Sequence, residues 1–424
     1  MDQQVFLGVS WGNLLTYMKR NSGMDPDMDL DMGDYYNVVL SFVYDYIPDP
    51  PVSPTPTLPL SGLPWVPDGV DRISCLPDKV LRNIVSRLPA KEAARTAALA
   101  SHWRPLWRSA PLALVDSHLL PDGGARGQLV FGGPSPRAVT AAVSRVLAAH
   151  RGPFRCVHLT RTTMDEHRGE MARWLDILVA KGVQELVFVN RPWPLDLRLP
   201  ATLFSCASLT RLYLGIWRLP DSAAVPRGAR FPNLRELGLC MIAMKDRDLA
   251  LLLERSPVLE FLLIMGCQIG VRLRLVSQSL RCLQLSMFFL GDMDVVDAPC
   301  LERLFQYNTN KNRSSRIKIG QAPKLRVLGY LEPGGQELII VAGSKESIVP
   351  SVQILAMEVQ FGVRSVVKKV PGFLRCFPNL ETLHVQSHHI SEEPTRKVNV
   401  KFWLQGGPIK CVVESMRKVF LYEF

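Results

Sequence analysis

The side chains best suited to metal binding gather near the end of the chain. They are His384, His388, His389, Glu392 and Glu393, and imidazole and carboxylate groups both ligate zinc. His384 and His388 would share a face only on a helix, whereas His384 falls in a strand-like repeat and the other four residues follow it in a turn. We therefore predict a solvated loop here and no metal site.

The motifs of common catalytic sites are missing from the sequence. It contains no Walker loop, GxGxxG, GxSxG, HExxH or kinase signature. The nine cysteines are scattered without a CxxC pair, which indicates reduced thiols rather than a disulfide framework. We predict a non-catalytic protein without a cofactor. Metal analysis of the purified protein would test the alternative, a metal- or nucleotide-dependent enzyme.

The composition is that of a folded protein. The chain has 424 residues, of which 47% are hydrophobic and 21% are charged, enough for one large core or two smaller ones. No apolar run reaches the ~18 residues that a membrane-spanning helix needs, and the first thirty residues lack the features of a secretory signal. We predict a soluble protein of the cytoplasm, the nucleus or both.

The formal net charge of +11 is unevenly distributed. Residues 1–70 contain nine Asp and two basic residues, so the remainder of the chain is strongly basic. A basic surface can attract nucleic acid. However, the densest basic cluster, residues 311–318 (KNRSSRIK), lacks the interleaved aromatic residues of a base-stacking surface. We predict a solvated loop there and no nucleic-acid partner.

Residues 1–70 form a predicted leader without stable structure. Closely spaced Asp residues lie among Met and Gly residues, and residues 48–67 are rich in proline. Proline has no backbone N–H to donate, and a segment of this composition buries too little apolar surface to offset its ordering entropy. We expect a disordered, acidic and proline-rich extension.

Residues 71–110 are predicted to form three short helices. Pro77 suits the first position of a helix. Apolar residues recur on one face of the helix that follows: Val80, Leu81, Ile84, Val85 and Leu88. Residues 90–99 have high helix propensity, and a third helix carries Trp103 and Trp107. Forty residues cannot bury so many large apolar groups in their own core, so some should be exposed for a partner.

This segment resembles the F-box motif of plant F-box proteins. The resemblance rests on residues in the family's order and spacing: Leu76-Pro77, Ile84, Leu88-Pro89, Thr96, Leu99, Trp103-Arg104 and Trp107. It implies a module that docks on a Skp-type adaptor, and through it on a cullin. The implied adaptor-binding residues are Leu76, Pro77, Ile84, Leu88, Trp103 and Trp107.

The segment also departs from the F-box motif. Ala98 and Ala100 replace larger residues, and Ser101-His102 replaces a basic pair. The lost buried volume would lower adaptor affinity rather than abolish it. The alternative reading is a small helical bundle that packs on its own domain.

From about residue 150 onward, the chain repeats an LxxLxL template. Successive copies start roughly 21 to 29 residues apart, which is the leucine-rich-repeat period. The copies begin at Phe154, Val183, Leu209, Leu234, Leu259, Leu280, Leu301, Leu325, Val352 and Leu380. One such unit cannot bury its apolar face alone, so neighbours stack and each contributes a strand to a parallel sheet.

The segments between the repeats differ in type. Residues 246–255 read as a helix with Asp246 as its cap, and residues 266–279 read as extended. The repeats resemble those of plant F-box proteins. The predicted fold class is therefore α/β, with a small three-helix F-box module followed by an irregular, horseshoe-shaped leucine-rich-repeat solenoid.

The end of the chain resembles the FBD region that closes many plant F-box proteins. The resemblance rests on residues 376–383, Phe402-Trp403 and residues 411–424. The family pattern continues through a further strand and helix, so the region reads as truncated. The predicted layout is a leader over 1–70, the F-box over 71–110, a linker over 111–150, leucine-rich repeats over 151–375, and a last repeat with a partial FBD-like region over 376–424.

The residues between the leucines predict a substrate-binding surface. In each template the leucines point into the core, and the third and fifth residues point out from the concave face of the sheet. These positions include Arg211, Tyr213, Glu236, Phe261, Gln284, Arg303, Phe305 and His384. Aromatic and Arg side chains dominate the binding energy of protein interfaces. The alternative is that Phe261 and Phe305 pack against a neighbouring loop or the FBD end.

Together these features predict the substrate-recognition subunit of a Skp-cullin-F-box ubiquitin ligase. The F-box would hold the adaptor, and the repeat arc would hold a protein substrate while other subunits transfer ubiquitin. The alternative is a leucine-rich-repeat binding scaffold whose degenerate F-box no longer engages the adaptor. Co-purification of the adaptor distinguishes the two.

Overall fold

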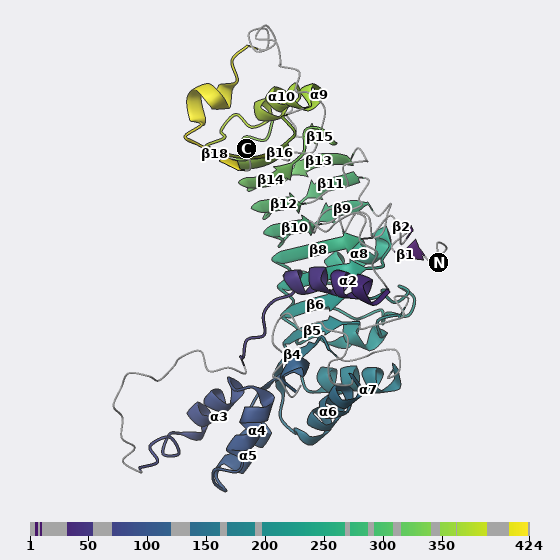
Figure 1. Ribbon diagram of the computed structural model, residues 1–424, viewed down its shortest axis with the longest axis vertical. Coiled ribbons are helices and arrows are strands. Elements are labelled where there is room, and N and C mark those ends of the chain that lie inside the picture. The colour runs from purple at the N-terminus through teal and green to yellow at the C-terminus, as the bar shows by residue number, and fades with distance from the viewer. Residues whose placement is uncertain are drawn as a thin grey trace. The chain divides into compact units, whose positions relative to one another are not determined.

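The structure is a computed structural model (Figure 1). It describes residues 5–6, 9–10, 32–53, 70–119, 136–161, 168–190, 197–267, 272–286, 292–307, 315–340, 348–361, 363–387 and 407–422. The chain divides into two compact units, each described by itself. The N-terminal unit comprises residues 18–234 and 238–242, and the C-terminal unit comprises residues 1–17, 235–237 and 243–424.

The N-terminal unit combines helices with a parallel sheet. Its described helices are α2 (Met32–Tyr46), α3 (Asp78–Ser86), α4 (Ala90–Thr96), α5 (Trp103–Ser109), η1 (Asp116–Leu119), α6 (Pro136–Ala149), α7 (Arg168–Ala180) and η2 (Ala201–Ser205). Four strands pair in parallel in chain order, namely β3 (Leu112–Val115), β4 (Phe154–Leu159), β5 (Glu185–Val189) and β6 (Arg211–Gly215). Strand β7 (Glu236–Ile242) has residues in both units.

The C-terminal unit is built around two parallel sheets. The main sheet contains β8 (Phe261–Cys267), β10 (Cys282–Ser286), β12 (Arg303–Tyr307), β14 (Val327–Leu331), β16 (Ile354–Val359), β17 (Thr382–Ser387) and β18 (Lys418–Tyr422), in that order. The second sheet contains β9 (Leu273–Val276), β11 (Asp292–Asp297), β13 (Ser315–Gln321) and β15 (Gln336–Ile340). The remaining elements are β1 (Val5–Phe6), β2 (Val9–Ser10), α8 (Asp246–Glu254), α9 (Arg364–Val367), α10 (Val370–Arg375) and η3 (Cys411–Ser415).

The core of the C-terminal unit contains the leucines of the repeated template. Each strand of the main sheet from β8 to β16 places one leucine at the same register position: Leu262, Leu283, Leu304, Leu328 and Leu355. All five are fully buried. Because these strands come from successive repeats, each leucine packs between its neighbours rather than within its own unit. The predicted α/β solenoid with parallel strands is confirmed.

The return segments follow the two predicted types. Helix α8 occupies the segment predicted as helical, and β9 lies in the segment predicted as extended. The predicted cap is wrong, because Lys245 is the N-cap and its backbone N–H donates to the Asp248 carboxylate at 2.8 Å. Asp246 instead accepts a hydrogen bond from the backbone N–H of Arg272 at 2.9 Å, which ties α8 to the segment before β9.

A ladder of polar side chains runs along the residues that precede the strands of the C-terminal unit. In chain order, its members are Arg235, Glu260, Arg281, Glu302, Arg326, Gln353 and Glu381. Arg235 pairs with Glu260, Arg281 with Glu302 at 2.8 Å, and Arg326 donates twice to the Gln353 side chain. Each backbone N–H also donates to the carbonyl of the previous member, as from Arg281 to Glu260 at 2.8 Å. The ladder therefore follows the repeat axis.

The region expected to be a linker over 111–150 contains the first strand of the sheet. All four residues of β3 are buried, and β3 pairs with β4. Helix α6 occupies the end of the same region. The sequence LALV of β3 carries no LxxLxL template, so the periodicity did not mark it. The linker prediction is corrected accordingly.

The expected disorder of the leader does not hold for residues 39–53. Val39, Leu40 and Val43, all on α2, are 2%, 3% and 0% exposed, and Val52 is 5% exposed. The short apolar run around Val39 supplies enough buried surface to order this part of the chain. The average composition of the leader, dominated by Asp and Pro, concealed that run.

We predict that shortening one core leucine destabilises the C-terminal unit strongly. Leu283→Ala removes buried methyl groups and leaves a cavity between Leu262 and Leu304, which should lower the free energy of unfolding by about 2–5 kcal/mol. Urea unfolding followed by circular dichroism would measure the loss. Arg303→Ala, at an exposed position of the adjacent strand β12, should change it by less than about 1 kcal/mol. Equal effects of the two substitutions would contradict the stacking model.

Candidate protein-binding surfaces

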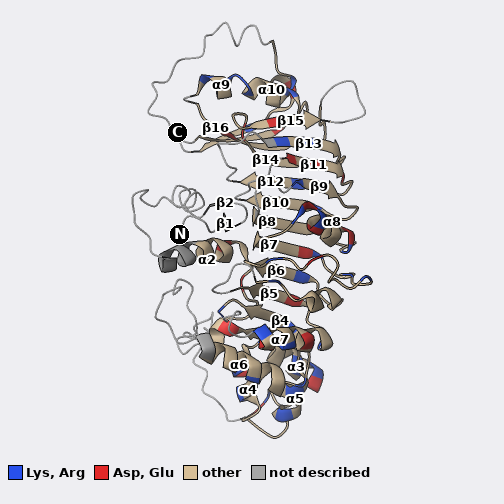
Figure 2. Cartoon of the chain, turned by 90° about the vertical axis from the view of Figure 1, so that its right-hand side faces the viewer, with Lys and Arg blue, Asp and Glu red and all other residues tan. Residues whose placement is uncertain are grey.

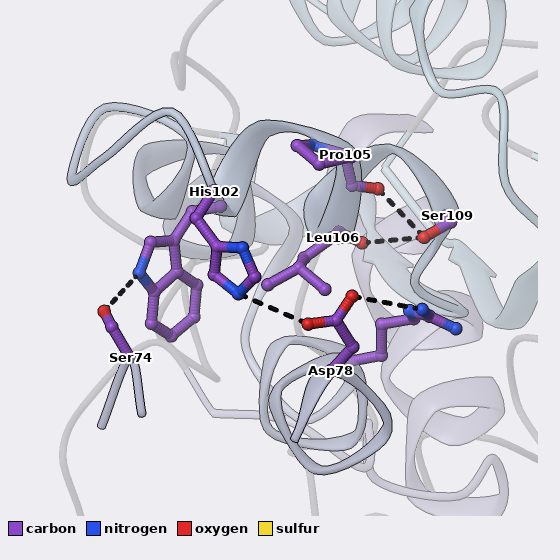
Figure 3. Close-up of polar contacts among 8 residues, drawn as sticks. Ser74, Asp78, His102, Pro105, Leu106 and Ser109 are labelled. Carbon is purple, nitrogen blue, oxygen red and sulfur yellow. Dashed lines mark hydrogen bonds and ion pairs between the residues drawn. The ribbon is translucent and has the colours of Figure 1, made fainter. Parts of the chain in front are cut away.

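Helices α3, α4 and α5 form a small module with its own interior. Leu81 and Val85 of α3 and Leu106 of α5 are almost completely buried. Trp103 is 5% exposed, and its indole N–H donates to the Ser74 hydroxyl at 2.9 Å (Figure 3). The module is attached to the sheet of its unit by a bridge between Pro89 and Ala113.

The outside of the module exposes apolar side chains. Leu76, Val80 and Ile84 are 39%, 43% and 37% exposed. Leu76 lies just before the start of α3, and the spacing of four residues places Val80 and Ile84 on one face of the helix. Large apolar side chains before α3 and after α4 are also exposed, namely Val70, Ile73 and Leu99. We call Leu76, Val80 and Ile84 the α3 apolar face. Apolar side chains gathered on one helical face are a common feature of protein interaction sites.

The predicted adaptor-binding residues divide into two groups. Leu76, Pro77 and Ile84 are exposed, and Leu88 is half-buried. Trp103 lies inside the module. Trp107 is half-buried, with its ring centroid 5.0 Å from that of His150. Because Trp103 is needed in the interior, the structure does not place it on the binding surface. Val80 was absent from the predicted set, although its spacing from Leu76 and Ile84 could have identified it.

Charged side chains flank the same module. Asp78 lies 3.3 Å from the His102 imidazole and 3.6 Å from the guanidinium of Arg82 (Figure 3). All three side chains are about half exposed, so each pair contributes at most about 1 kcal/mol. These contacts connect the start of α3 to the start of α5 but leave the α3 apolar face uncovered.

The main sheet of the C-terminal unit has an open face, defined as the side to which the residues between the core leucines point. Arg303 is exposed and Phe305 is half-buried on β12. Aromatic rings continue from Phe305, with centroids 6.0 Å apart between Phe305 and Tyr307 and 4.9 Å apart between Tyr307 and Tyr330. Phe261, Gln284 and Glu236 of the predicted set are partly exposed.

A second aromatic group lies where β17 and β18 pair. The His384 ring stacks on Phe420 with a centroid distance of 4.8 Å, and its Nδ1 is 3.0 Å from the Tyr422 hydroxyl. All five side chains of β18 are exposed. The other candidate metal ligands, residues 388–393, lie outside the described residues. Within the described part of the chain, no group of three or more His, Cys, Asp or Glu residues is arranged to hold a metal ion.

The corresponding face of the N-terminal unit is covered. Tyr213 is 4% exposed, and its ring occupies the space above Gly238, where a Cβ atom would lie only 2.2 Å from Cδ1 of the ring. Arg211 is half-buried and pairs with Glu185 at 3.5 Å. Tyr213 is therefore not available to a partner, although it was predicted to lie on the substrate-binding surface. The covering segment is considered below.

The described part of the basic cluster is paired with acidic residues and does not form a basic surface for nucleic acid. In the basic cluster expected to be a loop, residues 315–318 belong instead to β13, where Arg316 and Lys318 pair with Asp292 and Asp294 on β11. Figure 2 shows basic and acidic residues interspersed within each unit.

Burial raises the pKa of the Cys240 thiol to about 12, which keeps it protonated and unreactive. No helix among the described residues is long and apolar enough to cross a membrane.

Two family models match the chain. The model described as "F-box domain" matches residues 73–114, which include α3, α4 and α5. The model described as "FBD-associated F-box protein At5g56370, LRR repeats" matches residues 171–385, about half of the chain. The chain belongs to the plant family of F-box proteins with leucine-rich repeats. The family predicted from the sequence is confirmed.

Curated relatives of this F-box protein come from Arabidopsis thaliana. "F-box/FBD/LRR-repeat protein At1g13570" is 31% identical over 192 residues, which cover 45% of this chain and 43% of that protein. "F-box/LRR-repeat protein At3g26922" is 27% identical over 260 residues, covering 61% and 74%. "FBD-associated F-box protein At4g10400" is 27% identical over 387 residues, covering 84% and 86%. The match thus spans less than half of the first relative and most of the third.

We predict that the N-terminal unit loses stability in mild acid because of His158. This side chain is 3% exposed, and burial, together with the positive charges of Arg211 and His118, lowers its pKa from 6.5 to about 4. Between these values the unfolded chain binds more protons than the folded chain. The free energy of unfolding should therefore fall as the pH drops from about 6.5 to about 4, by up to about 3 kcal/mol.

Urea unfolding at pH 7 and pH 4.5 would measure this change. The variant His158→Gln carries no titrating group at this position, so its stability should differ less between the two pH values than that of the natural sequence. The same loss in both proteins would contradict the assignment to His158.

Proposed function

We propose that this chain is the substrate receptor of a Skp-cullin-F-box ubiquitin ligase. The observation that carries the proposal is the α3 apolar face, which is exposed on a module that matches the F-box domain. A Skp-type adaptor would cover Leu76, Val80 and Ile84, and would connect the chain to a cullin. The receptor itself is non-catalytic and acts in the cytoplasm, the nucleus or both.

The open face of the C-terminal unit is the proposed place for a protein substrate. It combines Arg303 with the rings of Phe305, Tyr307 and Tyr330, and aromatic and Arg side chains are enriched among the residues that dominate interface energies. Binding there would hold substrate lysines near the transfer machinery of the other subunits. The receptor would accelerate ubiquitin transfer by raising the effective concentration of the substrate.

A binding scaffold without an adaptor is the second candidate. It is favoured by the burial of Trp103 and the partial burial of Trp107, which remove two large side chains from the predicted docking surface. The remaining apolar face on α3 is correspondingly small. Adaptor binding decides between the two candidates.

We predict that a charge on the α3 apolar face weakens adaptor binding strongly. In Ile84→Asp, a carboxylate would be desolvated at the centre of the interface, which should weaken binding at least 10-fold, or about 1.4 kcal/mol. A pull-down with a purified Skp-type adaptor would measure the effect. Asn83→Ala changes the neighbouring exposed residue of α3 and should bind normally. Unchanged binding by Ile84→Asp, with an unchanged circular dichroism spectrum, would favour the scaffold.

We predict that the open face of the C-terminal unit is required for substrate capture. The double variant Arg303→Glu/Phe305→Ala reverses a charge and removes an aromatic ring, and should weaken substrate binding by about 2 kcal/mol or more. Affinity purification with the proteasome inhibited would show substrate proteins lost and the adaptor retained. Arg274→Glu, at an exposed position of β9 in the second sheet, is the matched control. If the double variant retains its substrates, the loops that follow the strands become the site to test.

A further inference from the structure

The open face of the N-terminal unit is occupied by the chain itself. Helix α2, drawn in purple beside β6 in Figure 1, and the residues that follow it lie against this face. Val187 and Val189, which point to this side of β5, are 1% and 0% exposed. This face of the sheet is therefore covered and not a free surface.

One anchor of the covering segment is Val43. A Cβ atom on Gly215 would lie 2.9 Å from Cγ1 of Val43 and 3.0 Å from Cγ2 of Val189. The sheet accommodates Val43 because residue 215 has no side chain, so the valine fills a notch in the surface of β6. Close packing of this kind requires a side chain of matching shape.

A second anchor lies nine residues further along the chain. Val52 packs in one buried cluster with Ala113, Val115 and Cys156. These residues come from the paired strands β3 and β4, and two of them, Ala113 and Cys156, have short side chains. The strands therefore form a shallow apolar site for Val52. This residue lies in the non-helical segment after α2, which ends at Tyr46.

A polar contact fixes the end of the helix between these anchors. The Tyr44 hydroxyl donates to the Thr160 carbonyl at 2.6 Å, and the Arg161 guanidinium lies 5.3 Å from the centre of the Tyr44 ring. The fully buried Asp116 holds both partners, because it accepts hydrogen bonds from the backbone N–H of Thr160 at 2.8 Å and of Arg161 at 2.6 Å. The receiving site is thus built by η1 and the residues that follow β4, and not by α2.

We propose that residues 39–53 are an internal competitor at a second protein-binding surface, the face of the sheet that they cover. The inference rests on the proposed receptor function and names the substrate class of this surface. That class is a protein segment with an apolar helix ending near a tyrosine, followed by an extended stretch with a small apolar anchor. Residues 54–69, five of which are proline, tether the competitor to the F-box module, so a substrate must displace a ligand held at high effective concentration.

The test uses the full chain and a fluorescent peptide of residues 32–53. The intact chain should bind the peptide weakly, because its own segment covers this surface. Val43→Asp places a charge in the notch and should release the segment, so this variant should bind the peptide at least 10-fold more tightly. Adding Gly215→Ala to Val43→Asp should remove most of that gain, because the new methyl group fills the space that Val43 of the peptide needs. Asp45→Asn, at an exposed position of α2, should behave as the intact chain.

Hydrogen exchange separates release from unfolding. In Val43→Asp, amides of α2 should lose protection while those of β4, β5 and β6 keep it. Tyr44→Phe removes the hydrogen bond to the Thr160 carbonyl and should give a smaller gain in peptide binding with an intact fold. The proposal is overturned if all these proteins bind the peptide equally or not at all, or if the strands lose protection together with α2. Because no adaptor or ubiquitin is present, failure here leaves the receptor function to its own tests.

Discussion

The structure depends on one constraint: a single repeat cannot bury its own apolar face. Each core leucine of the C-terminal unit is buried only because the strands before and after it supply partners at the same register position. This requirement makes the strands parallel, sets their register and turns the residues between the leucines to the opposite side. The mixed aromatic and charged row around Arg303 and Phe305 exists on the open face because the leucines cannot be there. The proposed substrate-binding face is thus made of the positions that the core does not use.

Sequence periodicity was sufficient for the elements that obey this constraint. The LxxLxL template predicted the strands of the main sheet from β4 to β17, but not β18 or the second sheet of the C-terminal unit. Helical spacing together with the F-box resemblance predicted the module of α3, α4 and α5. The periodicity did not predict strand β3, because its sequence carries no full template. Among the described residues, β3 pairs only with β4. The composition of the leader did not predict helix α2, because the apolar run of the helix is short and the surrounding sequence is acidic. Whether Val43 is buried depends on the absence of a side chain at Gly215, which lies far away in the sequence.

The candidate sites were predictable to different degrees. The exposure of Leu76 and Ile84 followed from an excess of apolar residues that a forty-residue module could not hide. Which of those residues stay inside could not follow from that count, since Trp103 is retained by a hydrogen bond to Ser74 and by packing. On the sheet, alternation gave the direction of Tyr213 correctly but not its surroundings. Alternation says which side of a strand a residue faces and says nothing about what another part of the chain places there.

The polar ladder of the C-terminal unit has a consequence for how such a chain can change in length. Charges alternate from Arg235 through Glu260, Arg281 and Glu302 to Arg326. Each exposed pair contributes little by itself. However, loss or duplication of a single repeat in this stretch would set two like charges side by side at the junction, whereas loss or duplication of two repeats would restore the alternation. The alternating charges of the ladder therefore favour the gain or loss of repeats in even numbers.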